Sequence, residues 1–183
     1  MTLPSDLTHF ISVDVETSGP NPSEHSLLSI GACTLAAPRH TFYIELQPDR
    51  EHFTHEALAV SHLSLAELAE KGTPPAEAME KFETWLKKTL LLAARPVFVA
   101  FNAPFDWSFV NDYFHRYLGH NPFGHNALDI KAFYIGRAGV AWDQTSLRVV
   151  SQRYLGDHRL SHNALHDAMD QADVFLKIME EFS

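Results

Sequence analysis

The chain has 183 residues, which suits one compact domain, and we expect a single domain over residues 1–183. A composition of 45% hydrophobic and 20% charged residues excludes a disordered chain, and the lone Cys33 excludes an intrachain disulfide. The net charge of −9 excludes a protein that coats nucleic acid with a broad basic surface, but it leaves a local groove open.

The N-terminal segment carries no basic residue before His9. It leads into a mostly apolar run of about seven residues, which is too short for a membrane span or a secretory core. We therefore expect a cytoplasmic protein that has no membrane segment.

The next segments predict three adjacent strands. β-rich runs occupy His9–Val15, Leu27–Leu35 and Thr41–Leu46, and polar turns at Ser18–Pro22 and Ala37–Arg39 separate them. Both connections are short enough for antiparallel neighbours. Cys33 lies in the second run, where burial as a small hydrophobic residue is expected.

From Thr54 the pattern becomes helical. Helices are predicted over Glu56–Val60, over Ser64–Lys71, and from Pro74 to about Leu92. The longest helix has apolar residues at spacings of three and four, which predicts one buried face made of Met79, Phe82, Leu86 and Leu90.

Strands and helices alternate in the second half. Val97–Phe101 predicts a buried strand, which a polar turn connects to a helix from about Phe105 to Leu118. Ala127–Tyr134 fits a strand or a strand running into a helix, and helices follow at Ser146–Tyr154 and Asn163–Phe182. The whole pattern predicts an α/β fold with a mixed sheet covered by helices, in which ligands gather at strand ends.

Two carboxylates, Asp14 and Glu16, stand at the end of the first strand. Alternate strand residues share a face, so both acids can converge on one site while Val15 points to the other layer. A hard cation such as Mg²⁺ would relieve their repulsion. A strand end that simply emerges into solvent is the alternative.

Two further acids, Asp106 and Asp167, lie near the starts of predicted helices. Asp106 lies just beyond the strand Val97–Phe101, where it could also be an ordinary acid of a helix first turn. Asp167 lies in the first turns of the last helix, and His162 precedes that helix. The alternative for His162 is a helix-entry histidine with no catalytic task, in a chain that has 12 histidines.

A basic stretch runs from Lys131 to Arg159, with five basic residues against two acidic ones. It is compatible with a local nucleic-acid groove and equally with solvated surface.

In these acidic blocks the sequence resembles the DEDDh 3′–5′ exonuclease superfamily, which includes ribonuclease T, oligoribonuclease and the proofreading subunit of bacterial replicative polymerases. The resemblance covers nearly the whole chain, through the blocks Val13–Gly19, Ala100–Asp106 and His162–Asp167. The ribonuclease T and proofreading type is the closer one. It implies a ribonuclease-H-like fold: a five-stranded mixed sheet with the second strand antiparallel to the rest, flanked by helices.

The resemblance also implies a two-metal mechanism with Mg²⁺, for which Mn²⁺ would substitute. Asp14 would bridge the two ions, Glu16 and Asp167 would complete the shell of the first, and Asp106 would act mainly on the second. His162, five residues before the last Asp as in the histidine branch, would be the general base that accepts a proton from the attacking water.

Substrate recognition is implied at Thr17 and Ser18, whose backbone groups would read the terminal 3′-hydroxyl together with the Glu16 carboxylate. Phe105 would stack on a terminal base. The expected activity is hydrolysis from the 3′ end of single-stranded nucleic acid, with RNA and DNA both open.

Two alternatives of another kind stay open. One is a catalytically idle nucleic-acid-binding or scaffolding module within a polymerase or repair complex, and the other is a hydrolase of very short oligonucleotides. Many histidine-branch members are homodimers, so the resemblance also implies a homodimer.

Overall fold

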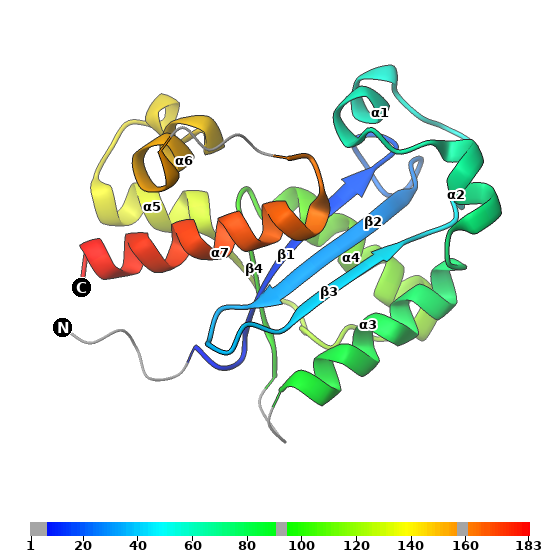
Figure 1. Ribbon diagram of the computed structural model, residues 1–183, viewed down its shortest axis with the longest axis horizontal. Coiled ribbons are helices and arrows are strands. Elements are labelled where there is room, and N and C mark those ends of the chain that lie inside the picture. The colour runs from blue at the N-terminus through cyan, green and yellow to red at the C-terminus, as the bar shows by residue number, and fades with distance from the viewer. Residues whose placement is uncertain (1–6, 91–94, 157–160) are drawn as a thin grey trace.

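The computed structural model describes residues 7–90, 95–156 and 161–183 (Figure 1). Within them one sheet contains the strands β1 (Phe10–Thr17), β2 (Leu27–Thr34), β3 (Thr41–Glu45), β4 (Val97–Ala100) and β5 (Ala127–Asp129). The helices are α1 (His55–Ser61), α2 (Leu65–Lys71), α3 (Pro75–Thr89), α4 (Pro104–Leu118), α5 (Ile130–Ala138), α6 (Leu147–Leu155) and α7 (Ala164–Glu181), with a 3₁₀ helix η1 at Trp142–Thr145.

The sheet has the strand order β3-β2-β1-β4-β5. β2 pairs antiparallel with β1 and with β3, whereas β1, β4 and β5 are parallel. This arrangement confirms the predicted five-stranded mixed sheet with an antiparallel second strand. The uncertain segment Ala127–Tyr134 is a short strand that runs into α5, and η1 was not predicted.

Several helix ends follow from local sequence signals. The side chains of Ser64, Ser146 and Asn163 cap α2, α6 and α7 by accepting a backbone N–H bond three residues further on. Pro75 and Pro104 occupy first-turn positions, where a missing N–H costs nothing. The predicted end of the third helix at Leu92 lies outside the described residues.

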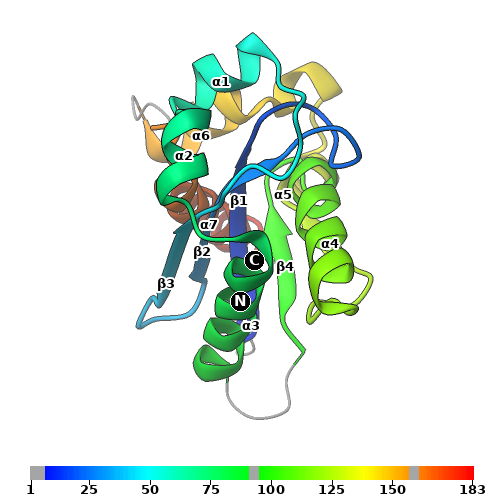
Figure 2. The same cartoon turned by 90° about the vertical axis from the view of Figure 1, so that its right-hand side faces the viewer.

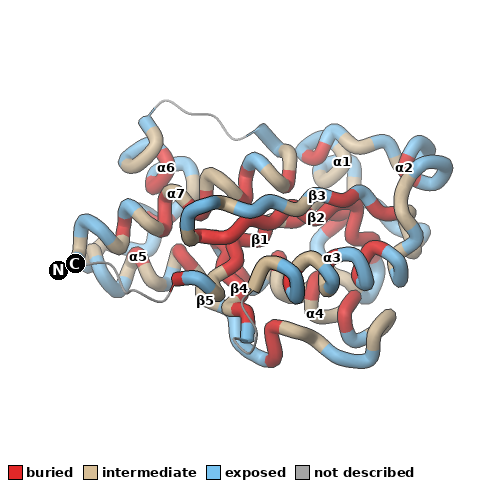
Figure 3. Tube along the Cα trace, turned by 60° about the horizontal axis from the view of Figure 1, so that its bottom comes forward, coloured by how far each residue is buried: buried red, intermediate tan, exposed pale blue. Residues whose placement is uncertain are grey.

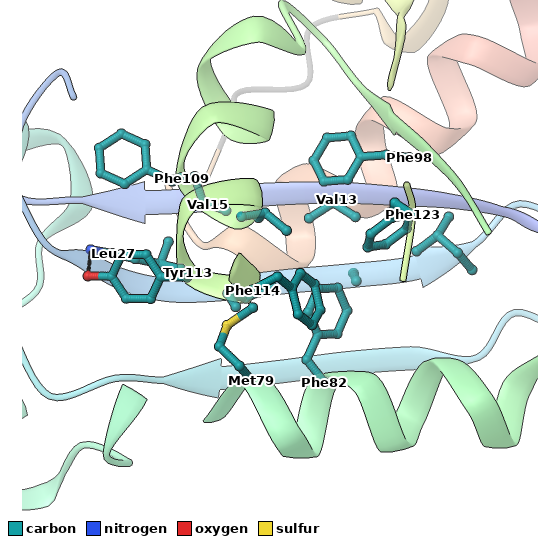
Figure 4. Close-up of a cluster of buried hydrophobic side chains, with 14 of the residues drawn as sticks. Val13, Val15, Leu27, Met79, Phe82, Phe98, Phe109, Tyr113, Phe114 and Phe123 are labelled. Carbon is teal, nitrogen blue, oxygen red and sulfur yellow. Dashed lines mark hydrogen bonds between the residues drawn. The ribbon is translucent and has the colours of Figure 1, made fainter. Parts of the chain in front are cut away.

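Helices α3 and α4 cover one face of the sheet, with α7, α5 and α6 on the other (Figures 1 and 2). Alternate residues of β1, namely Ile11, Val13 and Val15, point into the α3 and α4 face. Figure 4 shows the aromatic core that they meet there, and its fully buried members include Phe82, Phe98, Phe109, Tyr113, Phe114. The even-numbered residues of β1, including Asp14 and Glu16, are left for the α7 face.

The second core lies between the sheet and α7. It includes Cys33, Val99 and Phe175, and burial raises the pKa of the Cys33 thiol to about 12, so this cysteine is a packing residue, as predicted. In the tube of Figure 3 the central strands are largely coloured as buried, and every residue of β2 is buried, as expected of a sheet between two helical layers. Among the described helices, none is both long enough and apolar enough to span a membrane.

Candidate active site

The first two carboxylates, Asp14 and Glu16, lie in the C-terminal half of β1. Asp14 pairs in register with Gly31 of β2, and Glu16 pairs with Ser29. The next pair, Thr17 with Leu27, shows a register shift, which leaves Leu28 as an extra residue in β2. Such bulges re-aim side chains at the end of a ladder, and this one lies beside the acids.

The third carboxylate enters from the start of α4. β4 ends at Ala100, and Pro104 begins the helix, so Asp106 lies in its first turn. Asp106 is 4% exposed, and its Oδ1 accepts the Val15 backbone N–H at 3.1 Å. This bond ties the helix start directly to the strand that carries Asp14.

Asp129, at the end of β5, holds the turn that delivers Asp106. Its Oδ1 accepts the backbone N–H of Asn102 at 2.9 Å and that of Ala103 at 3.4 Å. The same oxygen caps α5 by accepting the Lys131 N–H at 3.0 Å. No role for Asp129 was predicted from the sequence, although an Asp before a helical segment is a recognised cap signal.

The fourth carboxylate, Asp167, arrives because α7 begins against the middle of β2. A Cβ atom built on Gly31 would lie 2.0 Å from the Ala164 carbonyl carbon and 2.1 Å from the Leu165 nitrogen. Real Cβ atoms do not approach backbone atoms that closely, so glycine is required for the helix to lie at this depth. Asp167 is 6% exposed, and its Oδ1 accepts the Ser161 N–H at 3.1 Å.

The structure brings the predicted catalytic residues together. Ligand atoms of Glu16, His162 and Asp167 all lie within 4.8 Å of one another, with His162 on the exposed side. A cavity of about 380 Å³ contains this cluster, and its lining residues are Asp14, Val15, Glu16, Thr17, Glu56, Ala57, Val60, Phe101, Asn102, Phe105, Asp106, Leu147, His162, Asp167 and Gln171. Acids from β1, α4 and α7 thus meet with a histidine in one hollow.

The acids strongly perturb one another. Burial raises the pKa of Asp14 well above its usual range, and repulsion from Asp106, Glu16 and Asp167 adds to it. Burial, followed by repulsion from Asp167, raises the pKa of Glu16 to about 7. Burial raises the pKa of Asp106 to about 8, although the bond from the Val15 N–H acts in the opposite direction. Without a cation, these three carboxyl groups therefore keep protons at a pH where a free carboxyl would be ionised.

The donor set fits a divalent cation. The described lining residues include no lysine or arginine that could neutralise the carboxylates. Carboxylate oxygens are the ligands that hard cations such as Mg²⁺ and Mn²⁺ prefer, and a histidine nitrogen is compatible with the latter. With no side-chain cation among the described lining residues, these carboxylates need bound protons or a bound cation to neutralise their charge.

Gln171 is a site residue that the sequence analysis missed. Its side chain is buried, and its Nε2 donates to Asp14 Oδ1 at 2.5 Å while its Oε1 accepts the Phe101 N–H at 2.8 Å. Gln171 follows Asp167 by one helical turn, so the two share a face of α7. This spacing was the available signal.

Backbone strain is concentrated around the cavity. Among the described residues, the non-glycine residues with positive φ are His62 (57°), Asn102 (63°) and His162 (52°). Asn102 and His162 line the cavity, and the His62 ring lies edge-on to that of His162 with 6.2 Å between centroids. Strained conformations of this kind cluster at functional sites.

The predicted substrate-binding residues are placed unequally. Thr17 and Phe105 line the cavity. Ser18 does not, because its N–H donates to the Ser26 carbonyl at 2.9 Å and its hydroxyl donates to the His52 carbonyl at 2.9 Å. Ser18 thus fixes the loop after β1, and Thr17 is the residue that faces the hollow.

The sequence of the chain matches the family described as exonuclease, RNase_T, over residues 11–175. The chain belongs to this exonuclease family. It is 46% identical over 175 residues to the 3′–5′ DNA exonuclease Cap18 of Escherichia coli, with 93% of this chain and 91% of that protein covered. It is 29% identical over 188 residues to ribonuclease T of Vibrio campbellii, which covers 94% of this chain and 86% of that one.

The fold agrees with that assignment. The nuclease domain of 3′hExo, a DEDDh family member solved with bound rAMP, superimposes with a TM-score of 0.79 at 15% identity, covering 97% of this chain and 94% of that domain. The chain is therefore an enzyme, a 3′–5′ exonuclease of the DEDDh type, and the family is dependent on divalent metal. The expected resemblance and the expected ribonuclease-H-like fold are both confirmed.

Proposed function

We propose that this exonuclease hydrolyses single-stranded DNA from its 3′ end by a two-metal mechanism in which His162 is the general base. The observation that carries the proposal is the convergence of Asp14, Glu16, Asp106 and Asp167 with His162 around one cavity. DNA is the proposed substrate because the relative that shares 46% identity is named a DNA exonuclease.

The four carboxylates would hold two Mg²⁺ or Mn²⁺ ions. When bound, these ions would neutralise charge on the phosphate and stabilise the attacking and leaving oxygens. Asp14 would be the central ligand of this set, because repulsion from each of the other three acids converges on it.

His162 would take the proton of the attacking water. Its ring is exposed at the mouth of the cavity, yet it lies within the 4.8 Å cluster that also contains Glu16 and Asp167. A base must reach both water and the reacting phosphate, and this position meets that requirement.

Thr17 and Phe105 would bind the terminal nucleotide, since both line the cavity that contains the acids. Thr17 would contact the 3′-hydroxyl, and Ser18 would support it by fixing the loop. Phe105, partly buried against Phe109 with 5.5 Å between ring centroids, would stack on the terminal base.

The test is a time course with 3′-labelled and 5′-labelled single strands of DNA and RNA, in Mg²⁺ or in EDTA. Wild type is compared with Asp14→Asn and with Glu80→Gln, a control acid that is exposed on α3. We expect immediate loss of the 3′ label and a 5′-labelled ladder that needs metal and Asp14. Faster degradation of RNA would overturn the choice of DNA, and failure to degrade any strand would leave the idle module or the short-oligonucleotide hydrolase.

A further inference from the structure

The surface beside the cavity contains an exposed aromatic residue that the proposed reaction does not use. Trp142 of η1 is 63% exposed, the largest value among the exposed large hydrophobic residues described. The Lys131 Nζ lies 3.9 Å from the centroid of its ring. An aromatic face next to a cation offers stacking for a base and charge for a phosphate.

Short backbone connections link this pair to residues that line the cavity. Lys131 is joined to Asn102, a lining residue, because Asp129 Oδ1 accepts the backbone N–H of both. On the other side, η1 continues through Ser146 into α6, whose first residue Leu147 also lines the cavity. Trp142 is therefore connected to lining residues on both sides.

The backbone under Trp142 is fixed. The buried Thr145 hydroxyl donates to the Trp142 carbonyl at 2.6 Å, and η1 packs against both α5 and α6. A ring held on a rigid turn binds a planar partner with little loss of side-chain freedom.

Charge favours this side of the cavity for a polynucleotide. The segment 131–155 contains four basic residues and one acid, although the chain as a whole carries −9. Helix α1 also borders the cavity, where Glu56 is a lining residue, and the segment 51–70 has four acids with no lysine or arginine. Phosphates would be repelled over α1 and attracted over α5, η1 and α6.

We infer that Trp142 and Lys131 form a subsite for nucleotides upstream of the scissile bond, with the base stacked on Trp142 and the phosphate beside Lys131. The single strand would leave the cavity over η1 and α6. This inference rests on the proposed exonuclease activity on single strands, and it assigns part of the basic stretch 131–159 to substrate binding.

The experiment compares Trp142→Ala with Phe53→Ala, which removes another exposed aromatic residue, 46% exposed, in the acidic segment 51–70. Steady-state kinetics are measured in Mg²⁺ on a deoxythymidine dinucleotide and on an oligodeoxythymidylate of about eight nucleotides. For Trp142→Ala we expect the KM of the longer strand to rise about 10-fold, as for one lost stacking contact, with a much smaller change for the dinucleotide. Phe53→Ala should leave both KM values unchanged.

A second readout does not depend on turnover. The other two tryptophans, Trp85 and Trp107, are partly buried against the core, so exposed tryptophan fluorescence comes from Trp142. Binding of the longer strand to the Asp14→Asn protein should quench this emission, and Trp142→Phe should abolish the quenching. Equal KM changes at both lengths, no quenching, or an effect of Phe53→Ala in place of Trp142→Ala would overturn the inference. If wild type degrades no strand, the proposed function fails instead.

Discussion

Replacing Gln171 by leucine tests whether this residue positions Asp14. The buried Phe101 N–H would lose its acceptor, which costs about 1–3 kcal/mol of the free energy of unfolding. Asp14 would lose the hydrogen bond at 2.5 Å from the Gln171 amide, and this bond lowers the pKa of Asp14. Without it the carboxylate would be less firmly oriented and harder to ionise. Loss of such a partner behind a metal ligand typically weakens metal binding or activity about 10-fold to 100-fold.

The assay separates this positioning role from a loss of stability. Urea unfolding gives the free energy of unfolding, and rates measured across a Mg²⁺ series give the half-saturating concentration. The control is Ile178→Val, a fully buried residue of the same helix, which should cost about 1 kcal/mol without moving the Mg²⁺ midpoint. If Gln171→Leu loses stability but keeps the wild-type Mg²⁺ midpoint and kcat, Gln171 only anchors α7, and the reasoning is refuted.

Three further predictions follow from the same geometry. Glu16 and Asp106 have pKa values raised from 4.5 to about 7 and from 3.8 to about 8, so the folded state keeps protons that the unfolded state has released. The free energy of unfolding without metal should therefore fall as pH rises from about 4 to about 8, and chemical denaturation with Mg²⁺ should show a larger stabilisation at pH 8 than at pH 6. His162→Gln should lower kcat about 100-fold or more with little change in the Mg²⁺ midpoint, whereas a rate within a few-fold of wild type would exclude it as the base. Gly31→Ala should displace α7 and abolish activity. Gly136→Ala, in helix α5 where a Cβ meets nothing within 4 Å, should leave activity unchanged and slightly raise the midpoint of thermal unfolding.

The three adjacent N-terminal strands and the side-chain parity of β1 could be predicted because they depend on local patterns. Alternating apolar residues fixed Val13 and Val15 in one layer and left Asp14 and Glu16 for the other, as observed. The turn between β4 and α4 was predicted in the same way, from a proline that starts a helix directly after an apolar strand.

The missed features all depend on contacts between distant segments. Gln171 appears in the sequence as one more polar helix residue, and its role exists only because α7 packs against β1 and reaches the residue that follows β4. Gly31 is a glycine inside an apolar strand, a signal for close backbone approach, but the approaching helix begins more than a hundred residues later. Asp129 caps its own helix and also holds a turn from another strand, and only the first of these is local.

These contacts share one physical consequence. The fold buries the carboxylates together, and hydrogen bonds from Val15 and Gln171 offset only part of the burial and the repulsion that raise the pKa of Asp14 and Asp106. The metal-free fold is thus destabilised at the candidate active site. A bound cation would remove that penalty and stabilise the fold by about 2.7 kcal/mol at a hundredfold excess over its Kd. Binding of metal and close packing of α7 on Gly31 should therefore strengthen each other, because both require the acids to remain at this distance.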